Sequence, residues 1–276
     1  MWKPEHRLVA DRSGLRYPSD LTDTEWAIVQ PMIPPARHGG RKRSVDVREV
    51  LNGIFYILWT GCQWKALPKD LPPKSTVHDY LELWNWDGTL ERIHHTLYVA
   101  VREQAGREAS PTVAIIDTQT AKGAQKGGSW LDPSGYDGAR RSKVVILVDT
   151  LGLLLNVVVH PADVQDRDGA FHLLRRARRL FPFIQRIFAD GGYAGDKTAL
   201  VCGRTGAWKL EIVKRSHAAG FEVLPKRWIV ERTFAWISRN RRLARDFERY
   251  ATTVAAFIRL AMIRIMLRRL AANVSL

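Results

Sequence analysis

Cysteine is nearly absent from the 276-residue sequence, which contains Cys62 and Cys202 alone. Two distant cysteines without a nearby histidine pattern argue against a disulfide framework or a zinc cluster. No stretch approaches the roughly 18 uncharged apolar residues of a membrane-spanning helix, because Arg259 and Arg264 interrupt the best candidate, residues 254–267. The first residues also lack the apolar segment of a secretion signal. These absences predict a soluble, cytoplasmic protein with no membrane partner.

Acidic residues are outnumbered by basic ones, 28 Asp and Glu against 43 Lys and Arg, which gives a formal net charge of +15. Such an excess predicts a polyanionic partner, and nucleic acid is favoured because no membrane segment accompanies it. Residues 225–276 hold 12 basic and 3 acidic residues, so they carry more than half of the excess. This asymmetry favours a localised DNA-contacting surface and association with the nucleoid. A Walker-type phosphate loop is also missing, which argues against a nucleotide cofactor.

The N-terminal region, residues 1–105, has the pattern of a helical domain. Thr22 and Glu25 have the spacing of a helix-capping box. Apolar residues recur at helical spacing through residues 47–58, and Gly61 is expected to end that helix. A basic, Pro- and Gly-rich linker precedes it. Helices separated by basic residues fit a small DNA-binding module, although a plain helical packing domain fits equally well.

Further helices of this region are delimited by proline. Residues 67–73 contain three prolines and are therefore excluded from a helix interior. Thr76 is a candidate cap for the helix that follows.

Beyond residue 111 the pattern changes to short apolar runs typical of strands. Strands are expected at residues 113–117, 144–148, 153–159, 184–189 and 209–214, with a hairpin-like turn at 149–152. Helices are expected at 169–181, 227–242 and 253–271. The order β, β-hairpin, α, β, α, β, α, α predicts an α/β fold.

Two acidic residues follow apolar runs, Asp117 after residues 113–116 and Asp190 after 187–189. A carboxylate at the carboxyl end of a strand lies at the mouth of a sheet, where ligand sites of α/β proteins form. The alternative is that each acid only caps a turn. Two such carboxylates side by side repel each other unless a cation lies between them. We therefore interpret the pair as candidate metal ligands.

A third candidate, Glu231, lies within the helix expected at 227–242. Val230, Phe234 and Ile237 mark the buried stripe of that helix, and Glu231 lies at its edge, about 100° from Val230. The alternative is a surface ion pair with Arg227, one turn earlier. The order of a strand acid, a second strand acid and a helix acid favours catalysis.

Asp117, Asp190 and Glu231 are thus the candidate catalytic and metal-binding residues. These three carboxylates would bind a metal ion through oxygen atoms only, which suits Mg²⁺, with Mn²⁺ as an alternative. Two such ions in one active site activate the attacking oxygen and stabilise the leaving oxygen in phosphoryl transfer. His160, which follows a strand, either assists the site or is a structural histidine.

Basic and aromatic residues are interleaved around the third acid. Arginines neutralise phosphates, and Trp236 either stacks on a displaced base or belongs to the core. The candidates for DNA contact come from the linker, the run before the second strand and the late helices: Arg41, Lys42, Arg43, Arg140, Arg141, Lys143, Arg227, Arg232, Trp236, Arg239, Arg241 and Arg242.

At these residues the sequence resembles the insertion-sequence transposases with a DDE catalytic triad, specifically the bacterial insertion sequence family five. The resemblance runs from about Tyr17 to Leu270. Its blocks are Leu21–Trp26 and Gly61–Pro68 in the N-terminal part, and Ile116–Thr120, Ala189–Gly195 and Val230–Trp236 in the core.

The resemblance implies a ribonuclease-H-like core, which is a mixed five-stranded sheet flanked by helices. On this basis we expect a helical DNA-binding domain at 1–105, a catalytic domain at 106–250, and a basic C-terminal helix at 251–276 packed on the core. Two departures stand out. Leu224 and Ser238 replace a Tyr and a Lys common in the superfamily, with Arg239 or Arg241 available in place of the Lys. The basic run at 135–144 is also shorter than in relatives.

The implied activity is metal-dependent cleavage of double-stranded DNA at the terminal inverted repeats, followed by strand transfer into target DNA. The need to bring two ends together implies a homodimer in the DNA complex. Two alternatives remain open. The first is a DNA-binding repressor or end-binding protein without catalysis, and the second is a ribonuclease-H-type nuclease acting on hybrids or junctions.

Overall fold

The computed structural model describes residues 11–36, 39, 42–124, 128, 130–131, 141–206, 208–213 and 227–274. The described residues form two compact units. Unit 1 contains residues up to 106, residues 240–242 and the chain from residue 260 onward, and unit 2 contains residues 107–239 and 243–259.

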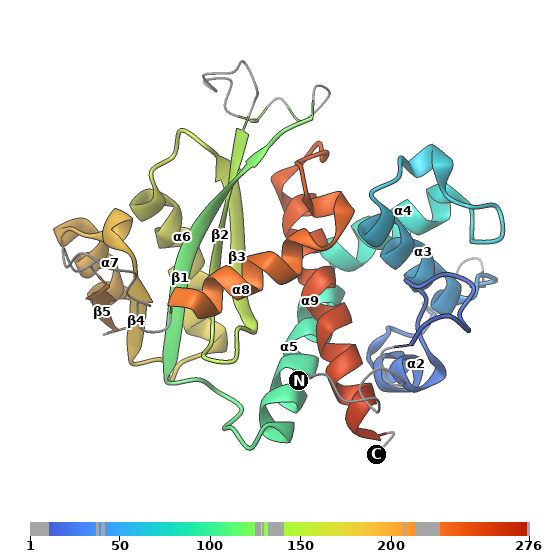
Figure 1. The fold of residues 1–276 in the computed structure, drawn as a ribbon, viewed down its shortest axis with the longest axis horizontal. Coiled ribbons are helices and arrows are strands. Elements are labelled where there is room, and N and C mark those ends of the chain that lie inside the picture. Colours follow the sequence, from blue (N-terminus) through green and yellow to red (C-terminus); the bar gives the residue numbers. More distant parts are fainter. Residues whose placement is uncertain are drawn as a thin grey trace. The chain divides into compact units, whose positions relative to one another are not determined.

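Unit 1 is helical (Figure 1). Val50, Ile54, Leu81 and Leu97 are fully buried in its core. The helices are α2 (Asp23–Val29), α3 (Val47–Thr60), α4 (Lys74–Trp86), α5 (Thr89–Gln104) and the second half of α9 (Ala251–Val274), with short 3-10 turns η1 (Gln30–Met32) and η2 (Trp64–Ala66).

Local signals in the sequence set most of these helix ends. The Thr22 hydroxyl accepts a hydrogen bond from the Glu25 amide (3.1 Å), and Glu25 accepts one from the Thr22 amide (3.0 Å), which confirms the capping box. Gly61 ends α3 with a left-handed φ of 68°. The cap expected at Thr76 is wrong, because α4 begins at Lys74 directly after Pro73. Pro73 takes the capping position, since its fixed φ suits the start of a helix.

Unit 2 contains the five-stranded sheet, whose order is β3-β2-β1-β4-β5 (Figure 1). β1 pairs antiparallel with β2 and parallel with β4, so the mixed sheet predicted from the sequence is confirmed. Val145–Val148 in β2 are all fully buried, as expected for a strand covered on both faces. The strands are β1 (Val113–Lys122), β2 (Arg141–Val148), β3 (Leu154–Pro161), β4 (Arg186–Ala189) and β5 (Lys209–Ile212).

Three helices cover this sheet. α6 (Asp166–Leu180) packs against β2 and β3, α7 (Asp196–Gly206) against β5, and α8 (Arg227–Ser238) against β1. Two expected boundaries need correction: α6 begins three residues earlier than 169, and α8 ends at Ser238 instead of 242. The chain after α8 forms a separate 3-10 turn, η4 (Arg241–Leu243).

α9 is the longest of the described helices, with 24 residues, and it contributes to both units. Arg259 and Arg264 lie within it and are buried, as are the apolar side chains around them. In the part of the chain that the structure describes, no helix combines the length and apolar character needed to cross a membrane.

Gly61→Ala is expected to destabilise unit 1 more than Gly106→Ala. Both glycines have a left-handed φ, 68° and 66°, which costs an alanine about 1–2 kcal/mol. A Cβ at Gly61 would also lie 3.0 Å from the backbone carbon of Arg241, whereas a Cβ at Gly106 would meet nothing within 4 Å. Denaturant unfolding should therefore show the larger loss for Gly61→Ala, and equal losses would contradict the proposed close approach.

Candidate active site

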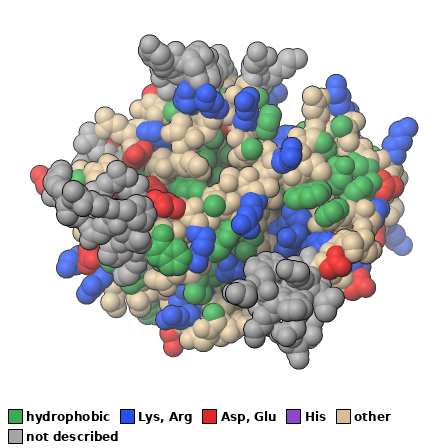
Figure 2. All heavy atoms as spheres, in the orientation of Figure 1, with side chains coloured by type: hydrophobic (Ala, Val, Ile, Leu, Met, Phe, Trp, Pro, Cys, Tyr) green, Lys and Arg blue, Asp and Glu red, His purple; other side chains and the backbone are tan. Residues whose placement is uncertain are grey.

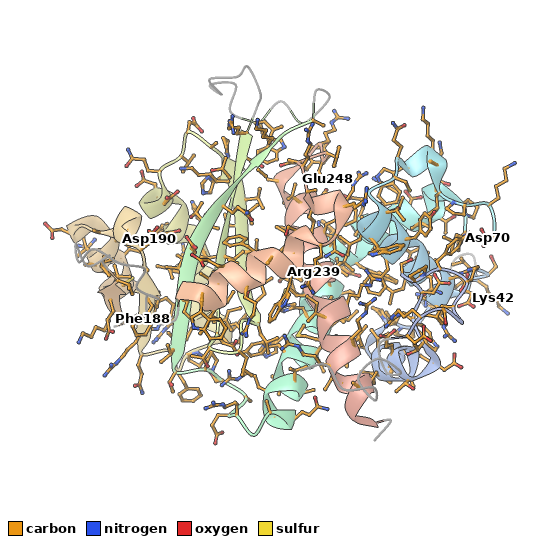
Figure 3. The ribbon with its side chains drawn as sticks, in the orientation of Figure 1. Lys42, Asp70, Phe188, Asp190, Arg239 and Glu248 are labelled. Carbon is orange, nitrogen blue, oxygen red and sulfur yellow. The ribbon has the colours of Figure 1, made fainter. Side chains whose placement is uncertain are left out.

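The register of the parallel pair β1–β4 brings the first two acids together. Ala114 pairs with Ile187 and Ile115 with Phe188. Asp117 and Asp190 each lie two residues beyond the last of these pairs, so the register, with strands spaced about 4.8 Å apart, brings them to the same level, and both line one cavity. Figure 3 shows Asp190 at the end of β4, beyond Phe188.

Asp117 is not a strand-end residue, contrary to the expectation from the sequence. β1 continues to Lys122, because its antiparallel partner β2 pairs with it as far as the Lys122–Arg141 position. Only the parallel pairing with β4 stops before Asp117. At Asp117, β1 is still paired with β2 on one side, but its pairing with β4 on the other side has ended. This leaves room for a ligand beside the carboxylate, on the β4 side.

Backbone amides hold one oxygen of each carboxylate. Asp117 Oδ1 accepts a hydrogen bond from the Thr118 amide (2.8 Å). Asp190 Oδ1 accepts one from the Gly192 amide (2.9 Å) and caps the 3-10 turn η3 (Gly191–Tyr193). Both residues are half-buried. These bonds fix the orientation of each carboxylate.

A cavity connects this pair to α8. Asp117 and Asp190 line it together with Ile115, Val213 and Val230. Val230 is buried, as are Phe234 and Ile237, so the buried stripe predicted for α8 is confirmed. Glu231 follows Val230 directly and is exposed. Among the described residues, no three His, Cys, Asp or Glu side chains converge closely enough to hold a metal ion.

The β2–β3 turn fastens α8 to the sheet. The Thr233 hydroxyl, which is fully buried, donates to the Gly152 carbonyl (2.8 Å), and Arg232 Nη2 donates to the Leu151 carbonyl (3.1 Å). Gly152 has a φ of 77°, and a Cβ there would lie 2.9 Å from the Thr233 hydroxyl. The turn itself is held by Asp149, whose Oδ1 accepts from the Leu153 amide (2.8 Å). These contacts set where α8, and therefore Glu231, sits against the sheet.

Arg232 lies between two indole rings on the same helix. Its guanidinium carbon is 4.6 Å from the ring centre of Trp228 and 4.8 Å from that of Trp236. Such cation–π contacts contribute about 0.5–1 kcal/mol each at partly exposed sites. Trp228 is about half exposed, whereas Trp236 is half-buried.

Asp166 is a further acidic residue at this site, and sequence reasoning missed it. It begins α6, and its Oδ1 lies 3.0 Å from Lys143 Nζ on β2. A Cβ on Gly192 would lie 3.1 Å from Asp190 Oδ1 and 3.4 Å from Asp166 Oδ2, so both carboxylates approach one point. In the sequence Asp166 looks like an ordinary first-turn helix acid, and only the topology brings it to Asp190.

Tyr193 lies among these acids as a neutral phenol. It is buried, and its hydroxyl is hydrogen-bonded to the Thr118 hydroxyl. Burial raises the pKa of Tyr193 far above its ordinary value, against the opposite effect of Thr118, and the charges of Asp166, Asp117 and Asp190 raise it further. Burial and the neighbouring carboxylates therefore both favour the protonated phenol.

The candidate DNA-contacting residues differ in their exposure and in the hydrogen bonds that they already make within the protein. Arg242 is buried and donates to the Cys62 carbonyl (3.2 Å), and Arg43 donates to the Pro34 carbonyl (3.1 Å). Lys42, Arg239 and Arg241 are exposed, and Figure 3 labels the first two. In the face drawn in Figure 2, Lys and Arg side chains are spread widely and outnumber the acidic ones.

Several residues that the sequence analysis names are not among those that the structure describes. Arg41, Arg140, Leu224 and the run at 135–140 are outside the described residues, as is the side chain of Arg227. Arg141 is half-buried on β2.

His160 is described, and its surroundings favour the structural interpretation. Its Nδ1 lies 2.8 Å from the Pro161 carbonyl oxygen. A Cβ on Gly169 would come within 2.2 Å of Nε2, so the imidazole packs directly on the α6 backbone.

The mixed sheet with the order β3-β2-β1-β4-β5 and its flanking helices agree with the ribonuclease-H-like core expected from the sequence. The family model described as a transposase DDE domain matches residues 108–266, more than half of the chain. The chain therefore belongs to the DDE transposase family. A second model, described as a putative transposase of the IS4/5 family (DUF4096), matches residues 21–94.

Two curated proteins from Burkholderia cepacia are similar to parts of the chain. A putative transposase for insertion sequence element IS402 is 34% identical over 137 residues, which cover 46% of this chain and 64% of that protein. An uncharacterized 16.2 kDa protein of IS402 is 26% identical over 113 residues, 39% of this chain and 76% of that protein. A crystal structure of the Mos1 mariner paired end complex with Mn matches 74% of this chain and 71% of that one, at 11% identity and a TM-score of 0.24.

Thr233→Val should destabilise unit 2 by about 1–2 kcal/mol, because it keeps the side-chain shape but leaves the buried Gly152 carbonyl without this donor. Ser238→Ala on the same helix is the matched control, since its hydroxyl is exposed and donates to the Ala235 carbonyl (3.1 Å). We expect that change to fall within about 0.5 kcal/mol. Equal losses in denaturant unfolding would show that the turn does not fasten α8.

Proposed function

We propose that this DDE transposase cleaves DNA at the ends of its insertion sequence and joins the freed 3′-hydroxyl to target DNA, with Asp117, Asp190 and Glu231 as the catalytic residues. The observation that carries the proposal is the position of Asp117 and Asp190 at one level of two neighbouring strands. Two carboxylates placed side by side in this way repel each other unless a cation lies between them.

Divalent metal dependence accompanies the DDE family, and the donor chemistry of this site fits it. The carboxylates supply oxygen ligands only, which suits Mg²⁺ or Mn²⁺. We propose Mg²⁺, two ions per active site, held by Asp117 and Asp190, with Glu231 completing one of the two sites. When bound, such ions activate the attacking oxygen and stabilise the leaving one.

Each residue has a distinct task in this proposal. Asp117 and Asp190 are held rigidly, since the backbone amides of Thr118 and Gly192 bind one oxygen of each. Glu231 is exposed and follows Val230, which lines the same cavity, and in this proposal its side chain turns toward the pair when DNA is bound. The Gly152–Thr233 contact limits that approach to side-chain movement, because it fixes the backbone of α8.

Both chemical steps are direct attacks by an oxygen nucleophile from outside the protein. In the first step water attacks the phosphorus at the element end, and the 3′-oxygen leaves as a hydroxyl. In the second step that hydroxyl attacks a phosphorus of the target, and the target's own 3′-oxygen leaves. Tyr193 is the tyrosine next to the acids, but it is buried and its pKa is raised by that burial, which makes it unsuited to act as a covalent nucleophile.

Contacts with the DNA backbone are proposed for exposed basic side chains. Lys42, Arg239 and Arg241 meet that condition, while Arg232 offers part of its guanidinium between Trp228 and Trp236. Phosphate contacts of this kind position the DNA without reading its sequence. Because transposition joins two ends of one element, we propose a homodimer in the DNA complex.

Asp117→Asn, Asp190→Asn and Glu231→Gln should each reduce strand nicking at least about 100-fold, because each removes charge where the transition state needs it. The substrate is a plasmid that carries the reading frame with its flanking DNA, incubated with Mg²⁺ or Mn²⁺. Asp196→Asn is the matched control, since this acid is exposed in the first turn of α7. Chelation of the metal should abolish nicking by the wild-type protein.

The outcome of that experiment also separates the alternatives. Wild-type nicking rates in Asp117→Asn would refute the assignment. Plasmid binding without nicking by the wild-type protein, in either metal, would favour an end-binding protein without catalysis. Nicking that ignores the flanking DNA would favour a general nuclease.

Arg241→Ala should weaken DNA binding and lower the slope of log affinity against log salt by about 1, with little change in thermal stability. Arg241 is exposed, whereas its neighbour Arg242 is buried against Cys62 and Trp64. Arg242→Ala should therefore lower the melting temperature. Filter binding at several salt concentrations measures the slope, and an unchanged slope in Arg241→Ala would remove this residue from the DNA-contacting set.

A further inference from the structure

The ion pair between Lys143 and Asp166 lies beside the second acid of the proposed centre. Lys143 Nζ is 3.0 Å from Asp166 Oδ1, and it also donates to the Val164 carbonyl (2.9 Å). The Lys143 side chain is only 19% exposed. The ion pair, the hydrogen bond to the Val164 carbonyl and partial burial hold this ammonium in one place, unlike an ordinary surface lysine, whose position is not fixed.

The pair approaches the centre from the α6 side of the sheet. Side chains alternate along β1, so Asp117 and Thr118 point to opposite faces. Lys143 is opposite Thr120 in the β1–β2 register and therefore shares the face of Thr118. On this face Thr118 bonds Tyr193, and Asp166 reaches Gly192 beside Asp190. Asp190 thus has Asp117 as its neighbour in the sheet and Asp166 as its neighbour from α6.

Asp190 has two carboxylate neighbours, Asp117 and Asp166, and each of them makes the potential at Asp190 more negative. A third carboxylate favours binding of a divalent cation, whereas a fixed ammonium beside it opposes that binding. Lys143 balances the charge of Asp166, so the two side chains have opposite effects on a cation held by Asp117 and Asp190. The balance is local, because the ammonium is fixed next to the Asp166 carboxylate.

We propose that Asp166 and Lys143 are positioning residues that set the affinity of the acid centre for divalent metal, Asp166 by adding negative charge beside Asp190 and Lys143 by offsetting that charge. This inference rests on the proposed function, because it assumes that Asp117 and Asp190 hold the ion. It gives Lys143 a role different from the phosphate contact expected from the sequence, and the two roles make different predictions.

The test is a titration of the full-length protein with Mn²⁺ alone, in which free Mn²⁺ is measured by electron paramagnetic resonance and no DNA is present. Lys143→Met should raise Mn²⁺ affinity about 3- to 10-fold, and Asp166→Asn should lower it by a similar factor. Lys143→Arg keeps the charge and should stay close to wild type. Lys209→Met and Asp163→Asn are matched controls, because both residues are exposed in the same unit, and they should change the affinity less than about twofold.

Two further arms separate failure of this inference from failure of the proposed function. If Asp117→Asn and Asp190→Asn leave Mn²⁺ affinity unchanged, the centre is not a metal site and the proposed function fails with it. If those two variants lose affinity while Lys143→Met and Asp166→Asn do not change it, only this inference is overturned.

Folding and DNA binding are checked on the same variants. Should Asp166→Asn lower the melting temperature below the range of the assay, the comparison of Lys143→Met with Lys143→Arg decides the question. Weaker plasmid binding by Lys143→Met together with unchanged Mn²⁺ affinity would assign Lys143 to the DNA backbone and overturn the proposal.

Discussion

The parallel pairing of β1 with β4 is the constraint on which the site depends. It sets Asp117 and Asp190 at one level of the sheet, so that two like charges must share a small space. Such an arrangement costs free energy in the absence of a cation, and proteins keep it where a ligand repays the cost. The surrounding bonds from the Thr118 and Gly192 amides do not remove this repulsion; they orient the two carboxylates.

The third acid depends on a different set of contacts. Glu231 is carried by α8, and α8 is held by the turn between β2 and β3 through Thr233 and Arg232. Gly152 permits this contact because a side chain there would fill the space of the Thr233 hydroxyl. Asp117 and Asp190 are therefore positioned by the paired strands β1 and β4, whereas Glu231 is positioned by a helix that is held at the β2–β3 turn. This difference explains how Glu231 is exposed while the first two acids are half-buried.

Much of the fold follows from local sequence signals, and the departures have physical causes. The capping box at Thr22, the end of α3 at Gly61 and the five strands depend on neighbouring residues and were predictable. The true length of β1 was not, because the strand continues only where β2 supplies hydrogen-bonding partners. Asp166 could not be found either. An Asp at the start of a helix carries no local sign that it lies next to Gly192, which is 26 positions later along the chain.

The sequence alone overestimates how much of the positive charge lies at the surface. The last 52 residues have a strong basic excess, yet Arg242, Arg259 and Arg264 are buried. Burial lowers the pKa of Arg264 to about 9, with further lowering by the charges of Arg268 and Arg12, and its Nη2 donates to the Pro18 carbonyl (3.0 Å). Because these guanidiniums are buried, they are not exposed to neutralise phosphates. The basic excess is therefore partly internal, and the DNA contacts proposed above fall on exposed members such as Arg239 and Arg241.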